Sequence, residues 1–126
     1  MKKCIATQAA PAAVGPYSQG VQAGNVVYLS GQLGIDPSTG KMAEGGVAAQ
    51  ARQSLSNILA LLDSLGASPE QVVKTTVFLA DMADFKTVNA EYAKVFSKDC
   101  PARSCVAVQA LPLGGLVEIE AIVALS

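Results

Sequence analysis

The sequence contains no histidine and no tryptophan among its 126 residues. The absence of histidine excludes Ser-His-Asp and Cys-His catalysis, acid–base chemistry by imidazole and the common zinc sites. The three cysteines form no CxxC pair, and there is no glycine-rich nucleotide-binding loop. We therefore expect neither a metal ion nor an organic cofactor. Any chemistry must come from arginine, acidic residues, cysteine, tyrosine, lysine or backbone groups.

Charged residues are also scarce, at 15% of the chain against about 25% in an average domain. The length suits one domain, residues 1–126, large enough to bury a core without disulfides. So few charges on a small domain predict that other copies of the chain cover part of its surface. The alternative is a monomer that is merely rich in alanine and valine. A net charge of −1, with Lys2-Lys3 as the longest basic run, does not favour a nucleic acid partner.

The cysteines and the N-terminal sequence indicate the cellular compartment of the protein. Cys4, Cys100 and Cys105 are an odd number, imply no disulfide framework and fit a reducing cytosol. The N-terminal stretch lacks the compact apolar run of a signal peptide. No stretch approaches the roughly 18 apolar residues of a membrane span. We expect a cytoplasmic protein with no membrane association.

Hydrophobic periodicity predicts an alternation of strands and helices. Residues 21–23 and 26–30 should form a hairpin about Gly24-Asn25, because both turn residues tolerate positive φ. Further strands are expected at 72–79, 104–111 and 117–125, with an additional strand at 3–7. A helix should present one apolar face and stop at Gly66; that face comprises Ala51, Leu55, Ile58, Leu62 and Leu65.

A second helix should follow Asp81 or Asp84, with an apolar face of Phe85, Val88, Tyr92 and Val95 or Phe96. This order of elements predicts an α+β domain whose helices cover one face of a sheet. The apolar character of the strands indicates that the other face is covered too, for which packing against other subunits would serve.

Arg103 is the first candidate for chemistry. Strand alternation puts it on one face with Cys105 and Ala107. Its planar guanidinium suits bidentate capture of a carboxylate, and a surface or salt-bridged arginine is the alternative. Cys105 could be a nucleophile of lowered pKa. It has no histidine partner, however, so a packed or pocket-lining thiol is preferred.

Glu118 and Glu120 share a strand face with Ile122 and Ala124. They are either the solvated face of that strand or ion-pair partners, or one is a general acid or base of raised pKa. If the last two strands formed a hairpin, Arg103 would lie about 20 Å from Glu118. A joint site therefore requires non-adjacent last strands or a contact between subunits, and both remain open.

Four segments, in order, resemble motifs of the RidA/YjgF/YER family of 2-iminobutanoate/2-iminopropanoate deaminases. The resemblance covers essentially the whole chain. The matching segments are 10–20 (APAAVGPYSQG), 30–32 (SGQ), 87–92 (TVNAEY), and 101–106 (PARSCV) followed by 117–120 (VEIE).

This resemblance implies a chorismate-mutase-like α+β fold, in which two helices cover one face of a mixed six-stranded sheet. It implies a homotrimer with active sites between subunits, acting on small imino acids without a cofactor or metal. Arg103 would hold the substrate carboxylate, and Glu118 would position and activate the attacking water. The other implied substrate-binding residues are Tyr17, Gly31, Asn89 and Cys105, the second and fourth through their backbone.

The implied activity is hydrolysis of reactive enamine or imine acids to 2-oxo acids and ammonia. One alternative is a non-catalytic regulatory module that binds 2-oxo acids in the same arginine pocket. Another is the endoribonuclease or translation-inhibitor activity attributed to some members. The sequence gives that activity little support, since it has no histidine, no basic stripe and no aromatic stacking platform.

Overall fold

The computed structural model describes residues 1–126, which form eight strands and two α-helices. The strands are β1 (Lys2–Ile5), β2 (Gly20–Ala23), β3 (Val26–Leu33), β4 (Ile35–Asp36), β5 (Lys41–Met42), β6 (Val72–Leu79), β7 (Ala102–Ala107) and β8 (Val117–Ala124). The α-helices are α1 (Gly46–Ser64) and α2 (Phe85–Val95), and 3₁₀ turns cover Pro69–Gln71, Met82–Asp84 and Pro112–Gly114. Neither α-helix combines the length and hydropathy that crossing a membrane requires.

Six strands form one sheet in the order β1-β2-β3-β8-β6-β7, while β4 and β5 form a separate pair. All neighbours in the large sheet are antiparallel except β6 and β7, which run parallel and are connected through α2. The sheet is therefore mixed and six-stranded, which confirms the expected fold class. Because β6 lies between β7 and β8, the last two strands of the chain are not adjacent.

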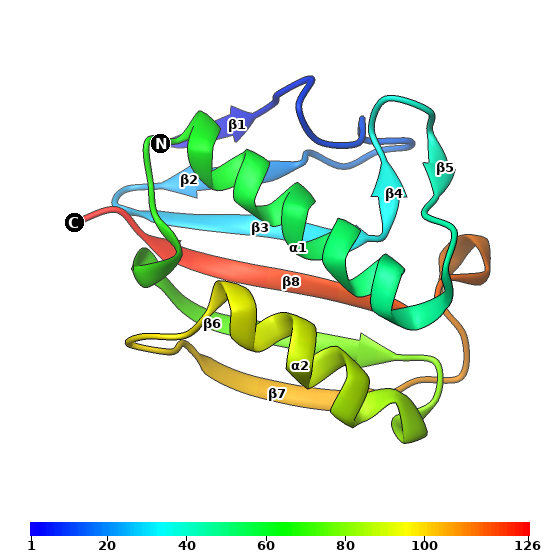
Figure 1. Ribbon diagram of the computed structural model, residues 1–126. Helices are drawn as coiled ribbons and strands as arrows, with labels where there is room; N and C mark the ends of the chain where they lie inside the picture. Colours follow the sequence, from blue (N-terminus) through cyan, green and yellow to red (C-terminus); the bar gives the residue numbers. More distant parts are fainter.

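Both helices cover the same face of the large sheet, as predicted (Figure 1). The predicted stripe of α1 is buried from Ala51 to Leu62, and α2 buries Val88 and Tyr92. Every second residue of β8, beginning at Val117, joins them in one core of 19 buried side chains. Burial of each large aliphatic side chain stabilises the fold by about 1.5–3 kcal/mol, so this layer holds the helices to the sheet.

The opposite face of the large sheet has no helix over it (Figure 1). Glu118 and Ile122 of β8 point to this side, because they alternate with the buried residues of the strand. Tyr28, paired with Ile122, and Val106, at the level of Glu118, share the face and are 51% and 44% exposed. In a single chain, large apolar side chains on this face of the sheet are therefore exposed to solvent.

Some helix and strand boundaries differ from the predictions, mainly where a turn or loop determines where the element begins or ends. The first helix, for which the sequence predicted an apolar face from Ala51 but no start, begins at Gly46, directly after Gly45 in a left-handed conformation with φ 115°. Its end is as predicted: Gly66 has φ 68° and its N–H donates to the Asp63 carbonyl at 3.0 Å. The strand predicted at 104–111 ends at Ala107, and the β4–β5 pair about the 36–40 loop was not predicted.

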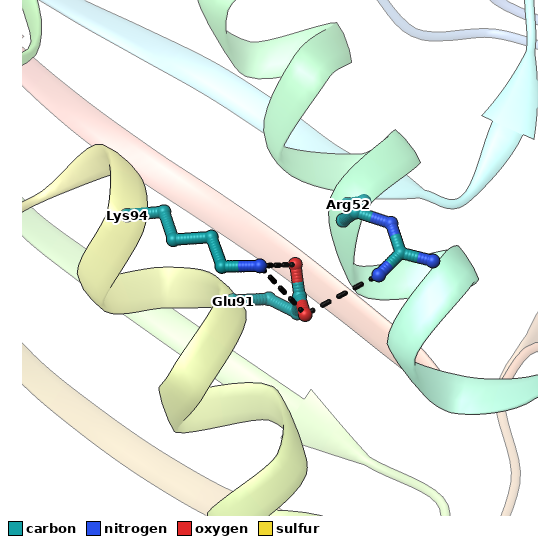
Figure 2. Close-up of polar contacts among 3 residues, drawn as sticks. All are labelled: Arg52, Glu91 and Lys94. Atoms are coloured by element: carbon teal, nitrogen blue, oxygen red, sulfur yellow. Dashed lines mark hydrogen bonds and ion pairs between the residues drawn. The ribbon is translucent and has the colours of Figure 1, made fainter.

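An ion-pair network centred on the largely buried Glu91 joins the two helices (Figure 2). Glu91 of α2, with a side chain 10% exposed, accepts from Arg52 of α1 at 3.3 Å and from Lys94 at 3.2 Å. Arg52 and Lys94 are more than half exposed, so water screens each pair and limits it to about 0–1 kcal/mol. The network fixes α2 against α1 and occupies the Glu91 carboxylate.

Candidate active site

Arg103 lies on β7, at one edge of the large sheet, and points to the helix-covered face. It is in register with Thr75 of β6, which is buried. Its Nη1 donates a hydrogen bond to Asn89 Oδ1 of α2 at 2.7 Å. Its Cζ lies 4.8 Å from the ring centre of Tyr92 and 5.6 Å from that of Phe85. The structure thus brings together Arg103 and Asn89, two of the predicted site residues.

No carboxylate of the chain pairs with Arg103, since the only two ion pairs both use Glu91. The alternative of a salt-bridged arginine is therefore wrong within one chain. Its contacts are an amide oxygen and two aromatic faces, which orient a guanidinium without neutralising it. The group remains free to bind the carboxylate of a ligand.

Cys105 lies on the same face as Arg103, two residues along β7, and packs against the core. Burial raises the pKa of the Cys105 thiol above its ordinary value, and the nearby Arg103 charge opposes this only in part. The thiol is therefore protonated at neutral pH, which contradicts a nucleophile of lowered pKa and favours the packed cysteine.

Glu118 lies on β8 and points to the face without helices. A Cβ added to Gly31 of β3 would be 2.8 Å from both Cδ and Oε2 of Glu118, so only glycine leaves room for this carboxyl. Burial raises the pKa of Glu118, and the neighbouring Glu120 charge raises it further. Glu118 forms no ion pair. A half-buried carboxyl of raised pKa suits proton transfer at a higher pH than an ordinary glutamate.

A cavity of about 680 Å³ opens at Glu118 and Gly31. Tyr17, from the 6–19 loop, lines the same cavity and is 52% exposed. Apolar side chains, including Val14, Ile35 and Leu113, form other parts of its wall. A smaller hollow of about 440 Å³ beside β1 contains Cys4 but neither Glu118 nor Arg103. Of the two, only the larger cavity is lined by Glu118, the carboxyl of raised pKa.

Two residues that organise this cavity were missed by the sequence prediction. Gln19 is 5% exposed, and its amide bonds the backbone of Thr7, Ala10 and Pro11, which shapes the loop that carries Tyr17. Ser30 Oγ donates to the Ser18 carbonyl at 2.6 Å. Both lie within segments that carry the family resemblance, but an isolated amide or hydroxyl gives no sign of such a role.

The six predicted site residues therefore form two separate groups in one chain. Asn89, Arg103 and Cys105 lie at the helix-covered face beside α2. Tyr17, Gly31 and Glu118 lie around the cavity, with Glu118 on the opposite face of the sheet. The first group supplies a free cation, and the second supplies a protonatable carboxyl beside an open cavity.

Comparisons with known proteins agree with this fold. A family model described as Endoribonuclease L-PSP matches residues 7–125. The 2-iminobutanoate/2-iminopropanoate deaminase of mouse is 52% identical over 122 residues, which cover 97% of this chain and 90% of the mouse protein. The protein of the same name from Salmonella typhimurium is 53% identical over 125 residues, 97% of each chain.

Solved structures are similar over nearly the whole chain. RidA from the Antarctic bacterium Psychrobacter has a TM-score of 0.93 and 49% identity, covering 97% of this chain and 98% of that one. Escherichia coli TdcF with bound serine has a TM-score of 0.93 and 44% identity, covering 98% of this chain and 99% of that one.

Proposed function

The chain belongs to the Endoribonuclease L-PSP family, and we propose that it is a 2-iminobutanoate/2-iminopropanoate deaminase. The reaction adds water across the C=N bond of a 2-imino acid and releases ammonia and a 2-oxo acid. Curated relatives at about half identity over nearly the full chain carry this name, which supports the same activity here. Cytosolic location is part of the proposal, supported by three free cysteines.

Arg103 binds the substrate carboxylate in this proposal. The guanidinium has no competing carboxylate in its own chain, and Asn89 fixes one of its nitrogens. A two-point contact with a carboxylate would set the plane of the substrate and the position of its imine carbon. The TdcF structure with bound serine supports a pocket for small amino-acid-like carboxylates.

Glu118 transfers protons in this proposal. As carboxylate, it accepts a proton from the water that attacks the imine carbon and delivers this proton to the imine nitrogen, which gives a neutral carbinolamine. Glu118 then takes the hydroxyl proton of this adduct and donates it to the amine nitrogen, so that ammonia leaves as the C=O bond forms and the carboxylate is restored. The raised pKa of Glu118 supports both steps, because the group exchanges protons closer to neutral pH. Tyr17 and the backbone of Gly31 and Cys105 would line the substrate pocket.

The observation that carries this proposal is the placement of Arg103 and Glu118 on opposite faces of one sheet. One substrate can contact both only if they come from different copies of the chain. We therefore include in the proposal a homotrimer with active sites between subunits. The open apolar face that carries Tyr28 and Val106 supports burial against a neighbouring copy.

A coupled assay tests the activity. An amino-acid dehydratase generates 2-iminobutanoate in situ, and its decay is followed by absorbance with and without this protein. We expect faster decay with wild-type protein and no acceleration with Arg103→Ala. Full activity of Arg103→Ala would refute the assigned site. Binding of 2-oxobutanoate without any acceleration of ammonia release would instead favour a binding module.

A further inference from the structure

Two uncharged residues, Tyr92 and Thr75, contact each other and both lie next to Arg103. The guanidinium carbon lies 4.8 Å from the ring centre of Tyr92. The Tyr92 hydroxyl shares a 2.7 Å hydrogen bond with Thr75 Oγ1, and both residues are buried, at 7% and 1% exposed. Thr75 is the direct neighbour of Arg103 across the parallel β6–β7 pair. Arg103 and the residue that anchors Tyr92 therefore lie at the same level of the sheet, on neighbouring strands.

Each contact removes freedom from a side chain that is otherwise flexible. The buried hydrogen bond to Thr75 fixes the rotation of the Tyr92 ring, which also packs on Phe96 with 4.7 Å between ring centres. The fixed ring attracts the guanidinium over its face. Arg103 has many rotamers, and ordering them before a ligand arrives lowers the entropy lost on binding.

We infer that Tyr92, anchored by Thr75, is a positioning residue that holds the Arg103 guanidinium ready for the substrate carboxylate. The inference rests on the proposed function of Arg103. Asn89 fixes one nitrogen of the group, and Tyr92 sets the plane in which the others are presented. Tyr92 touches Arg103 and not the reacting atoms.

The neutrality of this support matters to its role. A carboxylate beside Arg103 would orient the guanidinium but would also neutralise it and compete with the substrate. The carboxylate next along the helix, Glu91, pairs with Arg52 and Lys94 instead (Figure 2). Burial raises the pKa of the Tyr92 hydroxyl despite the nearby Arg103 charge, so the ring remains uncharged at neutral pH.

The test measures binding and catalysis separately on four single variants and on the double variant that combines Tyr92→Phe with Thr75→Val. Dissociation constants for 2-oxobutanoate are measured by titration calorimetry, and KM and kcat by imine hydrolysis. Tyr92→Leu removes the aromatic face, while Tyr92→Phe keeps the face but loses the hydroxyl. Thr75→Val removes the anchor with little change of shape. The matched control is Val88→Ala, a core truncation on the same helix at a residue 3% exposed.

Tyr92→Leu is expected to weaken 2-oxobutanoate binding and raise KM about tenfold, with kcat changed less than about twofold. Tyr92→Phe keeps the aromatic face, so its binding of 2-oxobutanoate should be only about threefold weaker than that of wild type. Thr75→Val should weaken binding by the same factor. The double variant should be no weaker than either single variant, because both remove the same hydrogen bond. Val88→Ala should melt at a lower temperature and bind normally.

Wild-type binding by Tyr92→Leu would overturn the inference, as would an equal loss in Val88→Ala. If Tyr92→Leu does not fold, Tyr92→Phe and Thr75→Val decide: unchanged binding in both would overturn it. Failure of the proposed function would look different, because wild-type protein would then not accelerate imine hydrolysis, and failure of the assigned site would leave Arg103→Ala fully active. Loss of binding in Arg103→Ala together with unchanged Tyr92 variants would remove only the positioning role.

Discussion

Arg103 and Glu118 point away from opposite faces of the same sheet, although only β6 separates their two strands. On β6, Arg103 is level with Thr75 and Glu118 with Phe78, an offset of three residues and about 10 Å along the strand. The sheet itself stands between the guanidinium and the carboxyl. No change of rotamer brings them to one substrate, so their cooperation within the proposed function requires a second copy.

Mixing two impaired variants tests this arrangement. Arg103→Ala should abolish imine hydrolysis and Glu118→Gln should reduce it by about 10²–10⁴-fold, whereas their co-expression at equal levels should restore activity. Random assembly gives about a quarter of sites an intact Arg103 from one copy and an intact Glu118 from another. The measurement is hydrolysis by the mixed, purified assembly. Activity no higher than the sum of the separate variants would contradict a shared site.

The Glu118 carboxyl should lower stability at neutral pH. Its pKa is raised in the folded chain, so the folded state binds the proton more tightly than the unfolded state. Stability therefore falls as pH rises from the ordinary glutamate value of about 4.3 through the raised value. Glu118→Gln should raise the melting temperature at pH 7, with the gain disappearing near pH 4, and should reduce kcat by about 10²–10⁴-fold.

The Glu120 charge should set the acid limb of the pH–rate profile. It contributes to the raised pKa of Glu118, after burial. Glu120→Gln removes that charge and should shift the acid limb of kcat/KM to lower pH, because Glu118 then ionises more easily. An unchanged profile would indicate that Glu118 is not the titrating base. Glu44→Gln, at an exposed position far along the chain, serves as the control.

Gly31→Ala should reduce activity through Glu118. The added methyl would lie 2.8 Å from Cδ and Oε2 of Glu118, closer than real contacts allow, so the carboxyl must move. A displacement of about 1 Å in a catalytic group can reduce the rate about a hundredfold. We expect kcat to fall by this order. Gly24→Ala serves as the control, because an added methyl there meets nothing within 4 Å and Gly24 does not line the cavity; its φ of +63° adds a backbone cost that Gly31 lacks.

Cys105→Ala should retain imine hydrolysis within about threefold, because the raised pKa of the thiol keeps it protonated and no step uses it as a nucleophile. Its proposed contact with substrate is through the backbone, which alanine preserves. A mass shift on trapping the enzyme with substrate, absent in Cys105→Ala, would contradict this expectation.

The fold was largely predictable because its buried faces have clear periods. The stripe from Ala51 to Leu62 marks α1, and the alternation from Val117 onward marks β8. The β4–β5 pair was not predictable, since two-residue strands have no period. Its loop depends on local bonds, such as the one from the Ser38 N–H to Asp36 Oδ1 at 2.9 Å.

The candidate site residues could be named from the sequence, but their grouping in the fold could not be predicted. Alternation within one strand predicts which of its residues share a face. It does not predict which face of the sheet the helices cover, and so it cannot relate residues on different strands. Two features separate Arg103 from Glu118: β6 lies between β7 and β8, and the two side chains point to opposite faces of the sheet. The positions of Gln19 and Tyr92 relative to the site likewise depend on long-range packing.

The alternation along β8 also determines which sequence changes this strand tolerates. Val117 and Ile119 fill the core, while Glu118 between them faces the cavity, so two sets of residues are interleaved in one short segment. Substitution can alter either set alone. Deletion or insertion of one residue inside the strand, directly after Val117, would exchange the two sets along the rest of β8, bury carboxylates and expose aliphatic side chains. Length variation among natural variants should therefore be confined to the neighbouring 108–116 loop and be absent from β8.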